Sequence, residues 1–258
     1  MAEGILITAA GKRIGRGLAE YLAGQGYYIY LHYHTGRADA EHTLTHIQQQ
    51  GGDGRLVACD LGDYEQTEKL VDRCRAAGHP LRHVINNASQ FIDDSIFDFT
   101  ADSLSSHQNV NLRAPMQLAR ALHGMIPDGE KGSVVNILDS KVFALNPDFH
   151  SYSLSKYALL GATEMMAQGL SPKLRVNGVA PGLTLISSSQ SAQNFNLASH
   201  LNFVGQPLRV EDVAKAAALL ISSPSINGAT LPVDGGQKMI NFTGDVVNVA
   251  EKILKRGD

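Results

Sequence analysis

The sequence predicts an α/β protein in which one parallel sheet carries helices on both faces. Short apolar runs alternate with longer segments whose apolar residues recur at helical spacing, the pattern of right-handed βαβ units. The runs "HVINNA" (83–88) and "SVVNIL" (133–138) are apolar almost throughout, as expected of strands buried on both sides. No linker, repeat or low-complexity tract interrupts the 258 residues. We therefore expect a single doubly wound domain over residues 1–258.

Seven strands should alternate with long helices. The expected strands are Gly4–Thr8, Tyr27–His34, Arg55–Leu61, His83–Ala88, Ser133–Leu138, Arg175–Ala180 and Thr230–Val233. The expected helices include Ile14–Gln25, Tyr64–Ala77, Leu104–Met125, Tyr152–Gly169 and Val210–Ser222. Residues 187–205 are rich in Ser, Gln and Asn and are expected to form a substrate lid. A C-terminal extension (238–258) should contain one more helix, which docks on the domain or on a sister subunit. The apolar face of that helix is Val246, Val247, Ala250, Ile253 and Leu254.

Composition excludes several classes of function. A net charge of −3 and a pI near 6.4 argue against a dedicated nucleic-acid or membrane-surface binder. Cys59 and Cys74 are too few for a disulfide framework or a thiolate metal site. His32 and His34 share a strand face, but no third ligand follows at a suitable spacing, so no metal is expected. The opening run "GILITAAG" is too short for a secretory or membrane segment, and the expected compartment is the cytoplasm.

A glycine-bearing turn, "TAAGKRIG" (8–15), joins the first strand to the first helix. A helix N-terminus reached through small residues attracts a pyrophosphate, and the strand–turn–helix context favours a dinucleotide over a merely tight turn. The second strand ends in "YLHYHTGR", and no acidic residue follows before Asp39. Lys12, Arg13, His34 and Arg37 should instead converge on this corner. Basic residues there accommodate a 2′-phosphate, so the sequence favours NADPH.

The stretch "NILDSKVFALNPDFHSYSLSK" (136–156) contains the candidate catalytic residues. Tyr152 and Lys156 lie four residues apart and share a helix face. The Lys156 ammonium is expected to lower the pKa of the Tyr152 phenol from about 10 towards neutrality, which would make it a general acid. Asp139 follows a buried strand, where its carboxyl group can hydrogen-bond the tyrosine and hand on a proton. Two alternatives stay open: Asp139 caps a turn, or Ser140 takes its place after a one-residue shift in register.

In order along residues 4 to 237, "TAAGKRIG", "NNAS", Asn111 in "NVNLRAP", "YSLSK", "RVNGVAPG" and "VDGG" resemble the short-chain dehydrogenase/reductase family. The resemblance implies a Rossmann domain, an NAD(P) cofactor and catalytic roles for Asn111, Tyr152 and Lys156, with Asp139 at the family's serine position. It also implies a homotetramer, assembled through 104–125 and 152–169. The cofactor-binding positions that it implies are Arg13, Ile14, Gly15, His34, Asp60, Leu61, Asn87, Ala88, Lys156, Pro181 and Gly182.

Within that family, Asp139 together with "GKRIG", "HYH" and "NNASQF" resembles the pteridine reductase branch, whose members use NADPH to reduce C=N bonds of pterins or dihydrofolate. The resemblance places Phe91 on the flat pterin, with Ser89, Tyr152 and Leu183 also at the substrate. An imine nitrogen needs a full proton, which a carboxyl–phenol pair supplies better than a hydroxyl alone.

This chain departs from the branch at the first turn, where Ala9 replaces a glycine, and after "HYH", where Thr35 and Gly36 replace an arginine and a serine. Two other functions remain open. One is reduction of a ketone, such as a 3-oxoacyl thioester or a sugar ketone. The other is a catalytically weak NADP-binding sensor, against which the intact Asn, Tyr and Lys set argues.

Overall fold

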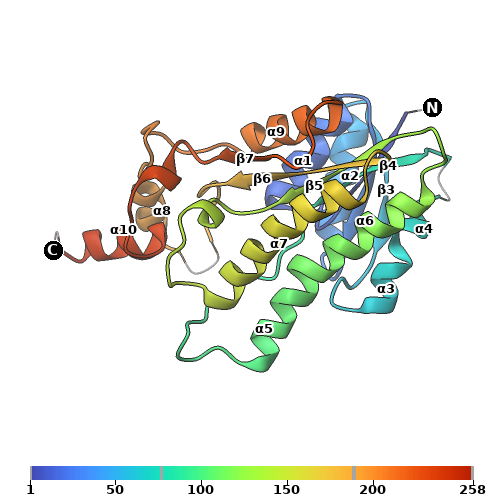
Figure 1. Cartoon of the computed structure of the whole chain (residues 1–258). Coiled ribbons are helices and arrows are strands. Elements are labelled where there is room, and N and C mark those ends of the chain that lie inside the picture. The colour runs from blue at the N-terminus through green and yellow to red at the C-terminus, as the bar shows by residue number, and fades with distance from the viewer. Residues whose placement is uncertain (1, 76–77, 188–189, 257–258) are drawn as a thin grey trace.

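The computed structural model describes residues 2–75, 78–187 and 190–256, and its centre is a seven-stranded sheet in the order β3-β2-β1-β4-β5-β6-β7 (Figure 1). Every neighbouring pair of strands is parallel. The strands are β1 Gly4–Ile7, β2 Tyr28–Tyr33, β3 Asp53–Ala58, β4 Leu81–Asn86, β5 Gly132–Ile137, β6 Leu174–Pro181 and β7 Thr230–Val233. The predicted doubly wound fold is confirmed. Strand order reverses between β1 and β4, where such folds bind their ligands.

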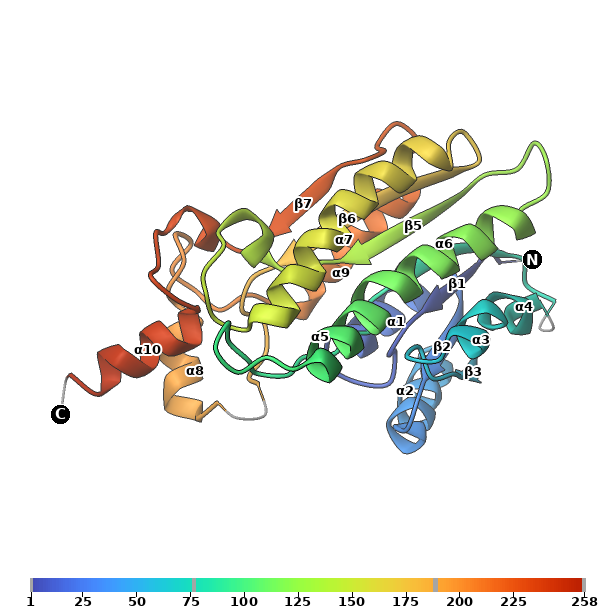
Figure 2. The same cartoon turned by 60° about the horizontal axis from the view of Figure 1, so that its bottom comes forward.

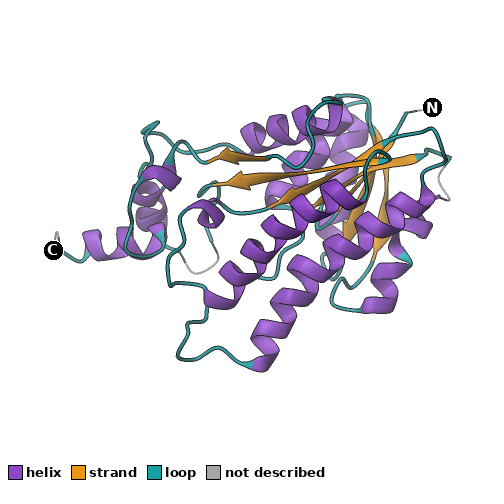
Figure 3. Cartoon of the chain, viewed as in Figure 1, coloured by secondary structure: helices purple, strands orange, loops and turns teal. Residues whose placement is uncertain are grey.

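Helices cover both faces of the sheet (Figures 2 and 3). α1 (Arg13–Gly24), α2 (Arg37–Gln49) and α9 (Val210–Ser222) pack on one face, and α4 (Leu70–Cys74), α6 (Ala114–Met125) and α7 (His150–Gly169) pack on the other. The apolar positions that repeat at helical spacing are the buried ones. On the first face these include Leu18, Leu22, Val213 and Ala217, and on the second Leu70, Leu118, Leu122 and Ala167.

The sequence analysis did not name α2 among its helices; α2 fully buries only Ala40, Thr43 and Ile47 and so lacks a broad apolar stripe. The helix expected at 64–77 is broken into α3 (Tyr64–Glu68) and α4, with Lys69 between them. Its last two residues, 76 and 77, lie outside the described part of the chain.

The long helix expected at 104–125 begins earlier and is interrupted. α5 (Ala101–Gln108) leads into one wide π-helical turn, η2 (Asn109–Arg113), before α6 begins. Such turns are rare and often occur at functional sites, and this one carries Asn111. α7 begins two residues earlier than expected.

The lid and the C-terminal extension lie beyond the carboxyl ends of the strands (Figure 1). Within 187–205, where no helix was expected, α8 (Ala192–Ala198) forms; residues 188 and 189 are outside the described chain. The predicted terminal helix is α10 (Val246–Leu254), and it packs on α8, where the Asn194 amide donates a hydrogen bond to the Val247 carbonyl at 3.0 Å. Residues 257 and 258 are likewise not described. Across the described helices, none is long and apolar enough to cross a membrane.

Candidate active site

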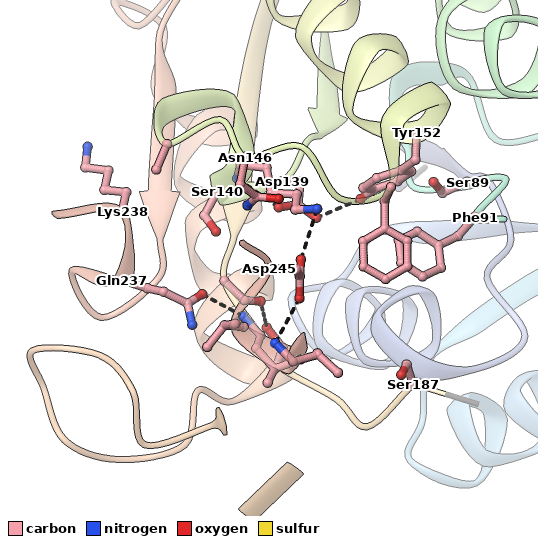
Figure 4. Close-up of a pocket in the computed structure, with 18 of the residues that line it drawn as sticks. Ser89, Phe91, Asp139, Ser140, Asn146, Tyr152, Ser187, Gln237, Lys238 and Asp245 are labelled. Atoms are coloured by element: carbon pink, nitrogen blue, oxygen red, sulfur yellow. Dashed lines mark hydrogen bonds and ion pairs between the residues drawn. The ribbon is translucent and has the colours of Figure 1, made fainter. Parts of the chain in front are cut away.

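A cavity of about 930 Å³ opens at the carboxyl ends of the strands (Figure 4). Of the predicted site residues, the cavity lining includes Arg13, Ile14, Gly15, Asn87, Ser89, Phe91, Asp139, Tyr152, Gly182 and Leu183. The cavity wall does not include His34, Asp60, Leu61, Ala88, Asn111, Lys156 or Pro181. Leu61 is a buried part of the hydrophobic core. Any role of this second group in binding therefore stays a prediction.

The N-terminus of α1 fits the pyrophosphate of a dinucleotide. Among the described residues no side chain caps this helix, and its first turn has no acidic residue, so its free N–H groups and positive dipole end face the cavity. Gly15 allows the close approach of the turn, because a Cβ at that position would lie 2.1 Å from the Ala9 carbonyl oxygen. The residues of the turn thus suit the cofactor that the sequence predicts.

Ala9 adopts the left-handed conformation, with φ of 52°, which favours glycine. His32 supports this conformation, because its Nδ1 accepts a hydrogen bond from the Ala9 N–H at 3.0 Å. Its Nε2 lies 3.0 Å from the Cys59 carbonyl oxygen, to which it donates. Burial lowers the pKa of His32 to about 4, so the ring is neutral. His32 therefore stabilises the conformation of the first turn through hydrogen bonds. The sequence analysis did not assign it this role.

The basic residues predicted at the 2′-phosphate take different partners. Arg13 donates from Nη1 to the Ile186 carbonyl across the cavity, at 2.8 Å. Arg37 pairs with Glu41 on its own helix at 2.8 Å, and His34 Nε2 lies 3.8 Å from Asp60 Oδ2. Lys12 Nζ, the fourth predicted cation, lies 3.9 Å from Asp39 Oδ2. Lys12 and Arg13 line the cavity, whereas His34 and Arg37 do not.

Asp139 and Tyr152 form the central contact of the site (Figure 4). The Tyr152 hydroxyl donates to Asp139 Oδ2 at 2.7 Å, while Asp139 Oδ1 accepts from the Lys141 N–H at 2.9 Å. The carboxylate thus caps the short turn η3 (Ser140–Phe143) and also contacts the phenol. Ser140 is the neighbour that a register shift would have placed here, but it is Asp139 that meets the tyrosine.

The prediction that the pKa of Tyr152 is lowered was wrong. Burial and the Asp139 carboxylate raise the pKa of Tyr152 well above its usual value, because a second negative charge beside the carboxylate is unfavourable. The Lys156 ammonium lies over the Tyr152 ring, 5.7 Å from its centre, and its hydrogen bond goes to the Ile137 carbonyl oxygen at 2.8 Å. Burial lowers the pKa of Lys156 to about 8. At neutral pH the site therefore contains a neutral phenol and a buried ammonium.

Asn111 connects the helices that carry this site. Its side-chain amide accepts from the Gln90 N–H at 2.7 Å and donates to the Gln90 carbonyl oxygen at 3.0 Å. It also donates to Ser155 Oγ at 2.9 Å. Asn111 thus joins the loop after β4 to α7, one residue before Lys156, and positions both.

Phe91 belongs to an aromatic cluster at the cavity wall. Its ring stacks on Phe149 with centroids 4.6 Å apart and meets the Tyr152 ring edge-on at 4.7 Å. Phe91 is nevertheless half exposed, so one part of the ring stays free to contact a flat ligand. Phe149 was not foreseen, because a phenylalanine in a loop gives no sequence signal of its role.

Fold and site together define a nucleotide-binding α/β protein with a tyrosine–lysine centre. A family model described as enoyl-(acyl carrier protein) reductase matches residues 9–238. Human L-xylulose reductase is 31% identical over 240 residues, covering 90% of this chain and 95% of that protein. The chain belongs to the short-chain dehydrogenase/reductase family.

Two solved structures are also similar. FolM alternative dihydrofolate reductase 1 from Brucella suis, in complex with NADP, has a TM-score of 0.89 and 32% identity, over 92% of this chain and 96% of that one. The angucycline C-6 ketoreductase LanV, with bound NADP, has a TM-score of 0.84 and 26% identity, over 92% and 96% of the two chains.

Proposed function

We propose that this protein is an NADPH-dependent reductase of a C=N bond in a pterin or dihydrofolate-type substrate. The observation that supports this most directly is the 2.7 Å hydrogen bond from Tyr152 to Asp139, a carboxyl–phenol pair at the cavity where the family has a serine. The similarity to a dihydrofolate reductase with bound NADP supports the same substrate class. NADPH, when bound, supplies the hydride.

The two residues can deliver the proton without any phenolate. When Asp139 is protonated, its carboxyl group donates to the Tyr152 oxygen, and Tyr152 gives its own proton to the ring nitrogen of the substrate. The pair loses one proton in total. After the transfer, Asp139 is a carboxylate that accepts a hydrogen bond from the neutral Tyr152 phenol. This is the hydrogen bond present in the structure. A raised pKa of Tyr152 is consistent with this relay, because the phenol is neutral before and after transfer.

A panel of substrates tests the proposal. The protein would be incubated with NADPH and dihydrobiopterin, dihydrofolate or an acetoacetyl thioester, and oxidation of the cofactor would be followed. We expect turnover of at least one of the two pterin-type compounds to exceed turnover of the thioester. Reduction of the thioester alone would refute the proposal.

The second candidate is a reductase of ketones. It is favoured by the similarity to L-xylulose reductase and to a ketoreductase. In that case Asp139 replaces the family's serine without supplying a proton, and a sugar ketone or an acyl thioester would be the better substrate.

NADPH is expected to bind at least about tenfold more tightly than NADH, a difference of about 1.4 kcal/mol. Arg13→Ala should remove most of that difference, because Arg13 lines the cavity, as Lys12 also does, and reaches across it to the Ile186 carbonyl. Arg37→Ala is the control, since Arg37 is already paired with Glu41. Titration of each protein with both cofactors measures the effect, and equal affinities in the unaltered protein would contradict it.

Turnover on a pterin should fall as the pH rises through about 8, the pKa of Lys156. Below that pH the buried ammonium is charged and stabilises the carboxylate that the relay leaves on Asp139; above it the charge is lost. Measurement of kcat over about pH 6 to 10, at saturating NADPH, checks the prediction, and a flat profile would count against it.

Tetramer formation also remains a prediction. Leu154 and Met165 on α7 are exposed, with 46% and 74% of their surface accessible, and could lie in a subunit interface. Leu159, which was expected in the same apolar face, is buried inside the subunit. Light scattering at micromolar concentration would measure the mass of the protein in solution, and a monomeric mass would contradict the prediction of a tetramer.

A further inference from the structure

One wall of the cavity comes from the C-terminal extension. Residues 238–247, called here the C-terminal wall, contribute Lys238, Met239, Ile240, Phe242 and Val246 to the lining. The facing segment after β5 adds Phe143 and Leu145. Met239, Leu145 and Phe143 expose 65%, 59% and 40% of their surface. Large apolar side chains that gather, exposed, around one cavity indicate a binding surface.

The C-terminal wall also contains an unpaired cation. The Lys238 ammonium lies 4.5 Å from the centre of the Phe143 ring. In the described part of the chain, no carboxylate forms a salt bridge with it. Figure 4 shows Lys238 at the far side of the site from Tyr152. A ligand that extends from Tyr152 along this wall would therefore meet apolar surface first and a positive charge last.

A buried ion pair fixes the wall to the catalytic turn. Asp245 Oδ2 lies 3.0 Å from the Lys141 ammonium, and their side chains are only 15% and 9% exposed. Lys141 also donates to the Asp148 carbonyl oxygen, and Asp148 Oδ2 accepts from the Asp245 N–H at 2.7 Å. Because the Lys141 N–H is bound to Asp139, the wall and the proton-donating carboxyl group are held by the same short turn (Figure 4).

We propose that the C-terminal wall binds the side chain of the substrate, and that this side chain is an aryl group ending in a carboxylate, as in a folate. Lys238 contacts the carboxylate, and Asp245 is a positioning residue that holds the wall in place through Lys141. The inference rests on the proposed pterin-type function and adds to it a preference for long-tailed over short-tailed pterins.

Binding to the NADP⁺-loaded protein tests the wall independently of turnover. Folate and biopterin share the pterin ring and differ in the tail, so calorimetric titration of both isolates the contribution of the tail. We expect folate to bind more tightly. Lys238→Gln should reduce that advantage by about tenfold, the size typical of a hydrogen bond to a charged group. Lys255→Gln is the matched control, because it removes the same charge from the C-cap of α10, outside the cavity lining.

Asp245→Asn tests the positioning role. It leaves Lys141 buried without its counter-charge, so the wall should loosen. We expect faster amide hydrogen exchange in residues 239–256 and a higher KM for dihydrofolate. The rise in KM for dihydrobiopterin should be smaller, because that substrate makes fewer contacts with the wall.

The outcomes separate the two proposals. If folate binds no more tightly than biopterin, or if Lys238→Gln weakens both equally, the wall does not recognise a tail and this inference is overturned. If the preference for folate holds and depends on Lys238, the inference stands even when no pterin is reduced. In that case only the proposed reaction fails.

Discussion

Replacing Tyr152 with phenylalanine is expected to lower kcat by about 10²–10⁴-fold on any substrate, the usual contribution of a general acid. The substitution removes the hydroxyl that donates to Asp139 at 2.7 Å and with it the only hydrogen that the relay can pass to the substrate. The ring itself should stay in place, because it packs against Phe91 and is almost fully buried.

The control is Tyr157→Phe, on the same helix but half exposed and outside the cavity; it should leave turnover unchanged. Melting temperature and NADPH affinity would be measured for both variants. If Tyr152→Phe retained more than about a tenth of the parent kcat, general acid catalysis by the phenol would be excluded.

Strands β1 and β5 were predictable because burial on both faces leaves an almost uninterrupted apolar run. β7 and α9 begin and end at the expected residues. Turn residues bound β7, and α9 has a full apolar stripe. The sequence analysis did not name α2, which fully buries only Ala40, Thr43 and Ile47 and partly buries Leu44. A broad apolar stripe makes a helix easy to detect from sequence, and turn residues that bound a short run do the same for a strand.

The site could be predicted only as far as it lies on regular elements. Helical spacing placed Tyr152 and Lys156 on one face, but it could not show that the Ile137 carbonyl would bind the ammonium. It also could not show that burial and the Asp139 carboxylate would raise the pKa of Tyr152 rather than lower it. The ion pair between Lys141 and Asp245 joins two irregular segments far apart in the chain, and neither residue type nor spacing points to it.

Replacing Asp139 with serine should separate the two candidate reactions. On a pterin, loss of the carboxyl group removes the proton source behind Tyr152, and we expect kcat to fall by about 10²–10⁴-fold. On a simple ketone, the introduced hydroxyl restores the group that the family normally has there, so turnover should be unchanged or should rise. Serine can still cap η3 by accepting from the Lys141 N–H, and the fold and NADPH binding should therefore persist.

Ser140→Ala is the matched control for Asp139→Ser, since Ser140 is the adjacent cavity-lining residue and is not the partner of Tyr152. It should change neither reaction appreciably. A structural carboxylate would behave differently from a proton donor, because its loss would depress both substrates together and lower the melting temperature. If Asp139→Ser reduces pterins as fast as the parent protein, the carboxyl–phenol relay is wrong, and reduction of a ketone becomes the better account of this site.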